Sequence, residues 1–355
     1  MSKRSTVSGV SCAALRAVAL AALMWTAASV VATAADPSFT AEERRRLARL
    51  TNLPAEGDLD AAKLAAASYA VVSPEKLADF ADADCAALAR LPALGSLALE
   101  RFPLTAACVE ALAGHQLSIR LIDVEFSPRT TAALGSMPSL INLRIEGGRG
   151  LGPHLADAFP PTSRLVRVTL GRIDGEILTR LRHLPKLSEL EIDGVTGDRG
   201  LAPLDGAPEL ERLSVNEASA ADLAVIAGLP KLASLHADLA KGIDETALRR
   251  LTASKSLREI SLAFADPPGA VGVGVLAEMP RLEHLRLVYQ TVPDRELARL
   301  ARSRSLTTLD LREATVSNAG LATLAESRSL RSVNLWRVDV SAAVRRKLKK
   351  RFEIE

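Results

Sequence analysis

The stretch LTTLDLREATVSNAGLATLAESRS, residues 306–329, joins a strand pattern to a helix pattern. Leucines at its first, fourth and sixth positions follow LxxLxL, with polar residues between them as on a half-buried strand. Leu321 and Leu324 lie three residues apart, as on one face of a helix. One strand and one helix of this size cannot bury their apolar faces alone, so the sequence predicts that copies stack side by side.

The apolar pattern of this stretch returns along the chain at a spacing of about 24 residues. A second apolar pair stands six and nine residues before most strands, for example Leu223 and Ile226 before Leu232. A proline often comes two residues before the strand, where it ends the helix and extends the chain. The first strand residue of each copy is predicted at Leu94, Ile119, Leu140, Leu165, Leu187, Leu210, Leu232, Leu257, Leu282, Leu306 and Leu330.

This unit resembles the leucine-rich repeat family, in particular the bacterial repeats similar to the ribonuclease-inhibitor and GALA types. The resemblance implies an α/β fold, a curved leucine-rich-repeat solenoid with a parallel sheet on the concave face and helices on the convex face. The family often has Asn or Cys three residues after the last strand leucine, whereas this chain has residues such as Ile173, Ala218 and Ala314. We therefore expect backbone groups or water to form the hydrogen bonds that the Asn side chain would make in those turns. The residues that carry the resemblance best are Leu306, Leu309, Leu311, Val316, Gly320, Leu321, Leu324 and Ala325.

The N-terminal segment, residues 1–35, predicts a secretory signal peptide. Lys3 and Arg4 precede an uncharged alanine-rich run that ends in AxA-type sequences. The predicted localisation is therefore periplasmic or secreted, and an uncleaved membrane anchor is the alternative. Without Lys3, Arg4 and Arg16 the 45 basic residues become 42, equal to the 42 acidic residues. A neutral mature chain does not favour nucleic-acid binding, which needs a basic excess on one face.

Three further regions follow this segment. Residues 36–90 lack a clear repeat and predict a helical N-terminal cap, with a capping-box pattern at Thr40 and Glu43 and a helix start at Ser73. Residues 91–340 predict about eleven repeats. Residues 341–355 predict a C-terminal cap whose helix starts at Ser341. The basic run in this cap suits a solvated helix end, and binding to anionic lipid is the alternative.

Motifs that suggest catalysis or cofactor binding have structural explanations. Residues 272–277 match GxGxxA, a dinucleotide-binding pattern, but Val273 and Leu276 belong to the repeated helix pair. Residues 147–150 are rich in glycine and are predicted to form a long repeat loop, with a phosphate-binding loop as the alternative. Residues 73–76 fit SxxK without the companion motifs of penicillin-recognising enzymes. We therefore predict no enzyme activity, no cofactor and no metal site.

Two cysteines remain in the predicted mature chain, Cys85 and Cys108. An even number in an exported protein permits a disulfide. Neighbouring helices, however, lie about 8–10 Å apart, beyond the bridging limit of about 7 Å between Cα atoms. We expect two buried thiols, with a disulfide as the alternative.

The residues between strand leucines are predicted to face the concave side, which solenoids use for binding. Acidic residues dominate the first seven repeats there, and this acidity provides either solubility or a docking surface for a basic partner. Trp336 either binds a partner or packs under the C-terminal cap. We predict an exported, monomeric, protein-binding module without a membrane span; an adaptor that recruits an enzyme or a structural envelope protein is the alternative. The predicted contact residues are Asp123, Glu125, Arg144, Glu146, Glu191, Asp193, His236, Asp238, Arg286, Asp310, Arg312 and Trp336.

Overall fold

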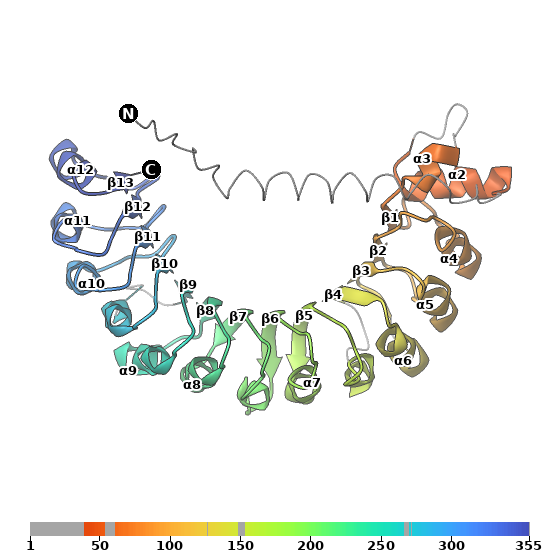
Figure 1. Ribbon diagram of the computed structural model, residues 1–355, viewed down its shortest axis with the longest axis horizontal. Coiled ribbons are helices and arrows are strands. Elements are labelled where there is room, and N and C mark those ends of the chain that lie inside the picture. The colour runs from red at the N-terminus through yellow and green to blue at the C-terminus, as the bar shows by residue number, and fades with distance from the viewer. Residues whose placement is uncertain are drawn as a thin grey trace, which may run out of the picture.

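The computed structural model describes residues 39–53, 61–125, 127–147, 153–265, 270 and 272–354. Its 13 strands form one parallel sheet in chain order. In Figure 1 the sheet forms an open arc, with strands on the inner side and helices on the outer side. The predicted solenoid, with a concave parallel sheet and convex helices, is therefore confirmed. The predicted signal peptide lies outside the described residues.

The strands are short because each crosses the arc once before the chain turns into a helix. They are β1 (Tyr69–Val72), β2 (Ser96–Glu100), β3 (Leu117–Ile122), β4 (Leu140–Glu146), β5 (Arg167–Asp174), β6 (Glu189–Thr196), β7 (Arg212–Ala218), β8 (Ser234–Leu239), β9 (Glu259–Phe264), β10 (His284–Arg286), β11 (Thr308–Asp310), β12 (Ser332–Asn334) and β13 (Glu353–Ile354).

The convex side mixes α-helices with 3₁₀ helices, which are written η. The helices are α2 (Ala41–Leu50), α3 (Ala61–Ala65), α4 (Asp82–Leu88), α5 (Ala106–Leu112), α6 (Pro128–Ser136), η2 (Pro153–Ala158), α7 (Gly175–Leu181), η3 (Ala202–Leu204), α8 (Ala220–Gly228), α9 (Glu245–Arg249), η4 (Arg250–Ala253), η5 (Val273–Glu278), α10 (Asp294–Leu300), α11 (Asn318–Leu324) and α12 (Ala342–Lys349). In the part of the chain that the structure describes, none is long and apolar enough to cross a membrane.

The core lies between the sheet and the helices and runs through the whole arc. Leu309 and Leu311 from the strand side meet Leu321 and Leu324 from the helix side, and all four are fully buried. Equivalent residues of the neighbouring copies are buried in the same way. The two apolar patterns in the sequence therefore correspond to the two walls of one continuous core.

Several turns after the strands are satisfied by the backbone, as expected for a chain without the Asn. Tyr289 and Glu313 adopt left-handed conformations, with φ of 63° and 55°. Their N–H groups donate to carbonyls of the next repeat, at 3.2 Å from Tyr289 to Arg312 and 3.0 Å from Glu313 to Trp336. Arg101 and Asp123 repeat this arrangement near the N-terminus.

Later repeats that lack a proline before the strand have a Ser-x-Ser sequence instead. The Ser303 hydroxyl accepts from the N–H groups of Ser305 and Leu306, which fixes the turn into the strand. The second serine donates to a carbonyl of the preceding repeat, at 2.9 Å from Ser305 to Met279 and 2.7 Å from Ser329 to Ser303. These hydroxyls therefore connect consecutive turns.

In the N-terminal region, one predicted helix is present and another is replaced by a turn. Thr40 and Glu43 form the expected capping box at the start of α2. Residues 73–76, predicted as a helix start, form only a turn. The segment before this turn is instead strand β1, whose Tyr69 pairs with Ser96 of β2. The sheet consequently begins inside the region that the sequence predicts to be helical.

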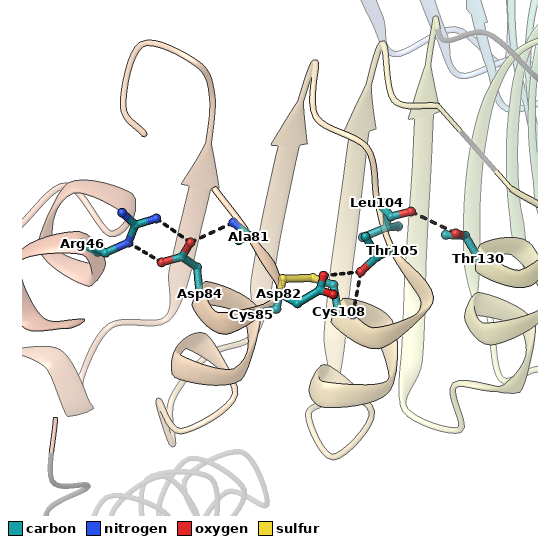
Figure 2. The surroundings of a disulfide bond; sticks show 9 residues. All are labelled: Arg46, Ala81, Asp82, Asp84, Cys85, Leu104, Thr105, Cys108 and Thr130. Carbon is teal, nitrogen blue, oxygen red and sulfur yellow. Dashed lines mark hydrogen bonds and ion pairs between the residues drawn. A yellow bond between two sulfur atoms is a disulfide. The ribbon is translucent and has the colours of Figure 1, made fainter. Parts of the chain in front are cut away.

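The prediction of two free thiols is wrong, because Cys85 of α4 and Cys108 of α5 form a disulfide (Figure 2). Their Cα atoms are 5.1 Å apart. The error came from using the distance between helix axes, since Cα atoms on facing sides lie about 2.3 Å from each axis and approach much closer. Closing a loop of this length stabilises the folded chain by about 3 kcal/mol. The bond ties α4 to the first predicted repeat.

Candidate functional site

The sheet register determines which side chains line the concave face. One column of facing residues runs through Ala98, Arg120 and Arg144 in β2, β3 and β4. It continues through the sheet as Thr169, Glu191, Ser214, His236, Ser261, Arg286, Asp310 and Asn334. Five of the predicted contact residues lie in this column: Arg144, Glu191, His236, Arg286 and Asp310.

Two predicted contact residues, Asp123 and Glu125, are not in the concave columns. Ile119 pairs with Leu97 and Leu143, so it is the second inward residue of β3 rather than the first. Ile119, Ile122 and Val124 imitate LxxLxL and shifted the predicted register by three residues. Asp123 lies in the turn after β3, where its N–H donates to the Glu146 carbonyl at 2.9 Å.

The correction alters the charge of the concave face. Arg120 takes the position predicted for Asp123, and the half-buried Ile122 takes that of Glu125. The predicted acidic surface is therefore interrupted by arginine at its N-terminal end. Carboxylates and guanidinium groups of neighbouring strands are then close enough to pair.

An ion-pair network crosses the concave face from β3 to β6, and we call it the central network. Glu146 accepts from Arg120 Nε at 3.0 Å and also from Arg144. Glu191 lies 4.0 Å from Arg144 Nη1 and accepts from the Thr169 hydroxyl at 3.3 Å. Residues of this network line an open hollow of about 420 Å³ that spans β2 to β6.

A second set of charges runs beside this network, in a column that the sequence analysis did not consider. Glu189 of β6 pairs with Arg167 of β5 and with Arg212 of β7, where the Nη1–Oε1 distance is 2.5 Å. The sequence did carry this signal: charges of alternating sign stand two residues after the predicted strand starts Leu165, Leu187 and Leu210. The predicted contact residues stand four or six residues after the predicted strand starts, so Arg167, Glu189 and Arg212 were not among them.

The central network holds Glu146 and Arg144 in their charged forms. Hydrogen bonding from Arg120 holds the pKa of Glu146 below its ordinary value, and Arg144 acts in the same direction. The hydrogen bond to Glu146 raises the pKa of Arg144. Groups held in this way present fixed charges to a partner and are poor proton donors or acceptors near neutral pH.

The His236 and Asp238 side chains, both on β8, are exposed on the same face. His236 lines a smaller hollow of about 210 Å³ together with Arg212 and Glu191. Asp193 on β6 is also exposed. Among the described residues, no group of three or more His, Cys, Asp or Glu side chains is placed to hold a metal ion.

The C-terminal end of the concave face combines arginines with aromatic rings. Asp310 accepts from Arg312, with Nη2–Oδ2 at 2.9 Å, and lies 3.3 Å from Arg286 Nε. Trp336 is 50% exposed, and the Arg337 guanidinium lies 4.2 Å from its ring centre. Tyr289, which the sequence analysis did not single out, is 71% exposed. Trp336 is therefore an open aromatic surface rather than a residue covered by the C-terminal cap.

The dinucleotide pattern at residues 272–277 has no room for a phosphate. The Gly274 N–H, which such a loop would offer to a ligand, donates to Glu296 of α10 at 2.8 Å. A Cβ atom on Gly274 would come within 2.7 Å of Arg299 and of Glu296. These glycines allow helices to approach each other. Residues 148–150 of the other glycine-rich segment lie outside the described residues.

Comparisons with known proteins identify similar folds. No protein-family model matches the sequence, and no curated protein matches it. Among solved structures, the chain is similar to an internalin, InlF, from Listeria monocytogenes, with 16% identity, 76% of each chain covered and a TM-score of 0.49. It is also similar to TLR13 in its complex with ssRNA13, with 19% identity and a TM-score of 0.44, covering 76% of this chain and 41% of TLR13. The leucine-rich repeat fold of this chain rests on its own parallel sheet in chain order and on its repeated strand-and-helix units.

Proposed function

We propose that this protein is an exported, non-enzymatic binding module that recognises a partner protein on its concave face. The observation that carries the proposal is the placement of exposed aromatic rings in a chain with only 3% aromatic residues. Among the described residues, the large hydrophobic side chains left exposed are Tyr69, Tyr289 and Trp336. All three lie on the concave strands or in the turns that end them. Exposed Tyr and Trp beside Arg are typical anchors of protein interfaces.

The polar part of the face supports the same function. Its central network is ordered by ion pairs before any partner arrives, which lowers the cost of ordering side chains on binding. Fixed charges of both signs favour a partner with a matching pattern and reject others. The same pairing lowers the pKa of Glu146 and leaves this carboxylate unsuited to acid–base catalysis.

Export is supported by the disulfide between Cys85 and Cys108, since disulfides persist in oxidising compartments. The alternative of an adaptor requires a free recruitment module in residues 36–90. The described part of that region instead packs onto the solenoid, because β1 extends the sheet and α4 is cross-linked to α5. These contacts favour a binding protein without a separate recruitment module.

The test is capture of partners from the envelope and culture fractions of the source cells. The concave variant changes Glu146, Glu191 and Asp193 to Lys. We expect it to lose the specific partner captured by the unchanged chain, with affinity reduced at least tenfold, because like charges replace complementary ones.

A matched control reverses the same number of charges on the convex side, by changing Glu110, Glu176 and Asp198 to Lys. These residues are exposed and form no ion pair within the described part of the chain. The control must keep the partner. Equal capture by the concave variant would reject this face as the docking site, and mass spectrometry of the mature N-terminus tests export independently.

A further inference from the structure

The charge of the protein is divided unevenly along the solenoid. Residues 301–355 contain twelve Lys or Arg and six Asp or Glu, so this end carries six net positive charges. The whole chain carries +3, and the preceding residues are therefore net negative. Consecutive repeats are neighbours in space, so this sequence asymmetry becomes a basic pole at the C-terminal end of the arc (Figure 1).

A hollow of about 650 Å³ lies at this pole, where α10 and α11 end and their chains turn toward β11 and β12. Arg302, Arg304 and Arg328 line it, with Glu326 as the one acidic residue among the lining residues. All three arginines are exposed. The hollow therefore carries two net positive charges and opens to solvent.

These arginines differ from those on the concave face. Arg120, Arg144 and Arg212 each pair with a glutamate. Arg302, Arg304 and Arg328, in contrast, form no ion pair with any residue that the structure describes. Cations are favoured at helix C-termini, which explains one arginine beside each helix. It does not explain three unpaired guanidinium groups around one hollow.

The final helix extends the basic surface beyond this hollow. The Arg351 side chain donates to the Ser327 carbonyl at 3.0 Å, so it lies beside the turn that contains Arg328. Lys347 of α12 donates to the Ala322 carbonyl at 3.1 Å. Arg346, Lys349 and Lys350 of the same region are exposed. These cations lie at the same end of the solenoid as Arg302, Arg304 and Arg328, and we call the whole set the C-terminal basic edge.

We propose that the C-terminal basic edge binds the phosphate groups of anionic membrane lipids, with the hollow at Arg302, Arg304 and Arg328 holding a headgroup. Guanidinium groups pair well with phosphate oxygens. Clusters of four to eight basic residues are typical of anionic-lipid binding. Single-stranded nucleic acid, the other common polyanion, requires aromatic residues for base stacking. The described aromatic residues of this end are Phe352, which is buried, and Trp336, which lies at the concave face.

The test measures sedimentation of the full chain with vesicles of equal parts phosphatidylglycerol and phosphatidylcholine, and with vesicles of phosphatidylcholine alone. The full chain binds the anionic vesicles more tightly, and added salt reduces the difference. Changing Arg302, Arg304 and Arg328 to Gln weakens binding to anionic vesicles about a hundredfold, because each basic residue near such a surface contributes about fivefold. The apolar segment before residue 36 is present in every protein compared, so the variants differ from the full chain only in their basic residues.

A control removes three exposed basic residues elsewhere, by changing Arg180, Lys186 and Arg199 to Gln. This variant keeps the anionic preference, and circular dichroism confirms that both variants are folded. Equal binding to the two vesicle types, or equal loss in both variants, overturns the proposal. Tighter binding to single-stranded oligonucleotides than to the anionic vesicles overturns the assignment to lipid, and so does displacement by inorganic phosphate at low concentration.

Discussion

At the scale of single residues, buried carboxylates connect one repeat to the next. Asp222 is the third residue of α8 and accepts from the Ser219 N–H at its own helix start, at 2.8 Å. It also accepts from the Leu201 N–H of the preceding repeat, at 2.6 Å. Glu296 occupies the same position of α10 and reaches back to Gly274. Each carboxylate thus satisfies backbone donors that helix starts leave unpaired.

Replacement of Asp222 by Ala is expected to lower the free energy of unfolding by about 1–3 kcal/mol, because the buried Leu201 N–H loses its acceptor. Asn at this position retains one oxygen acceptor and should cost less than Ala. Urea unfolding measures both changes. Asp198→Ala, at an exposed residue two positions before the Gly200 turn, is the matched control and should stay within about 0.5 kcal/mol. A loss as small as the control's would show that Asp222 does not connect the repeats.

At the scale of helices, the 3₁₀ helix η5 is narrow enough for side chains of α9 and α10, on either side of it, to contact each other. Glu245 of α9 accepts from Arg299 of α10, with Oε2 to Nη1 at 2.8 Å, although η5 lies between them in the chain. A Cβ on Gly272 would come within 2.7 Å of the Glu245 Cα. The glycines that imitate a dinucleotide loop therefore serve helix packing. The glycines alone fit both roles, because both require a close approach to the glycine backbone, and it was the helix pair Val273 and Leu276 that favoured packing in the sequence.

The pair between Glu245 and Arg299 makes stability depend on pH. Hydrogen bonding from Arg299 lowers the pKa of Glu245 from 4.5 to about 2. A carboxyl whose folded pKa is lowered stabilises the fold above its unfolded pKa, and the contribution disappears as pH falls through the folded value. The unchanged protein should therefore melt at a higher temperature than Glu245→Gln at pH 7, with the difference shrinking between pH 4.5 and about 2. A difference independent of pH across that range would contradict this assignment.

At the scale of the whole molecule, the fold was predictable because apolar periodicity determines the core, whereas the site was only partly predictable. The solenoid was predicted from many copies of one pattern. An error of three residues in the predicted register at Ile119 therefore did not change the predicted fold. It nevertheless moved Asp123 and Glu125 to the wrong surface, because each side-chain direction depends on the register of its own strand. The disulfide was missed for a different reason. The distance between the two cysteine Cα atoms depends on which side of each helix the cysteine occupies, and the spacing of the helix axes does not determine this.

The stacking of repeats predicts how damage at one end spreads. Leu348 of α12 is fully buried against the last repeats, so Leu348→Ala should destabilise this end by about 2–5 kcal/mol. In a solenoid each unit packs its apolar core against its neighbours, and terminal units protect the next apolar layer from water. Hydrogen exchange should accordingly become faster in β11 and β12 and remain unchanged in β2 to β6. Leu190→Ala, at a buried position in the middle of the sheet, should instead accelerate exchange on both sides of β6. Uniform acceleration along the arc in Leu348→Ala would mean that the chain unfolds as one cooperative unit and that its ends do not act as separate caps.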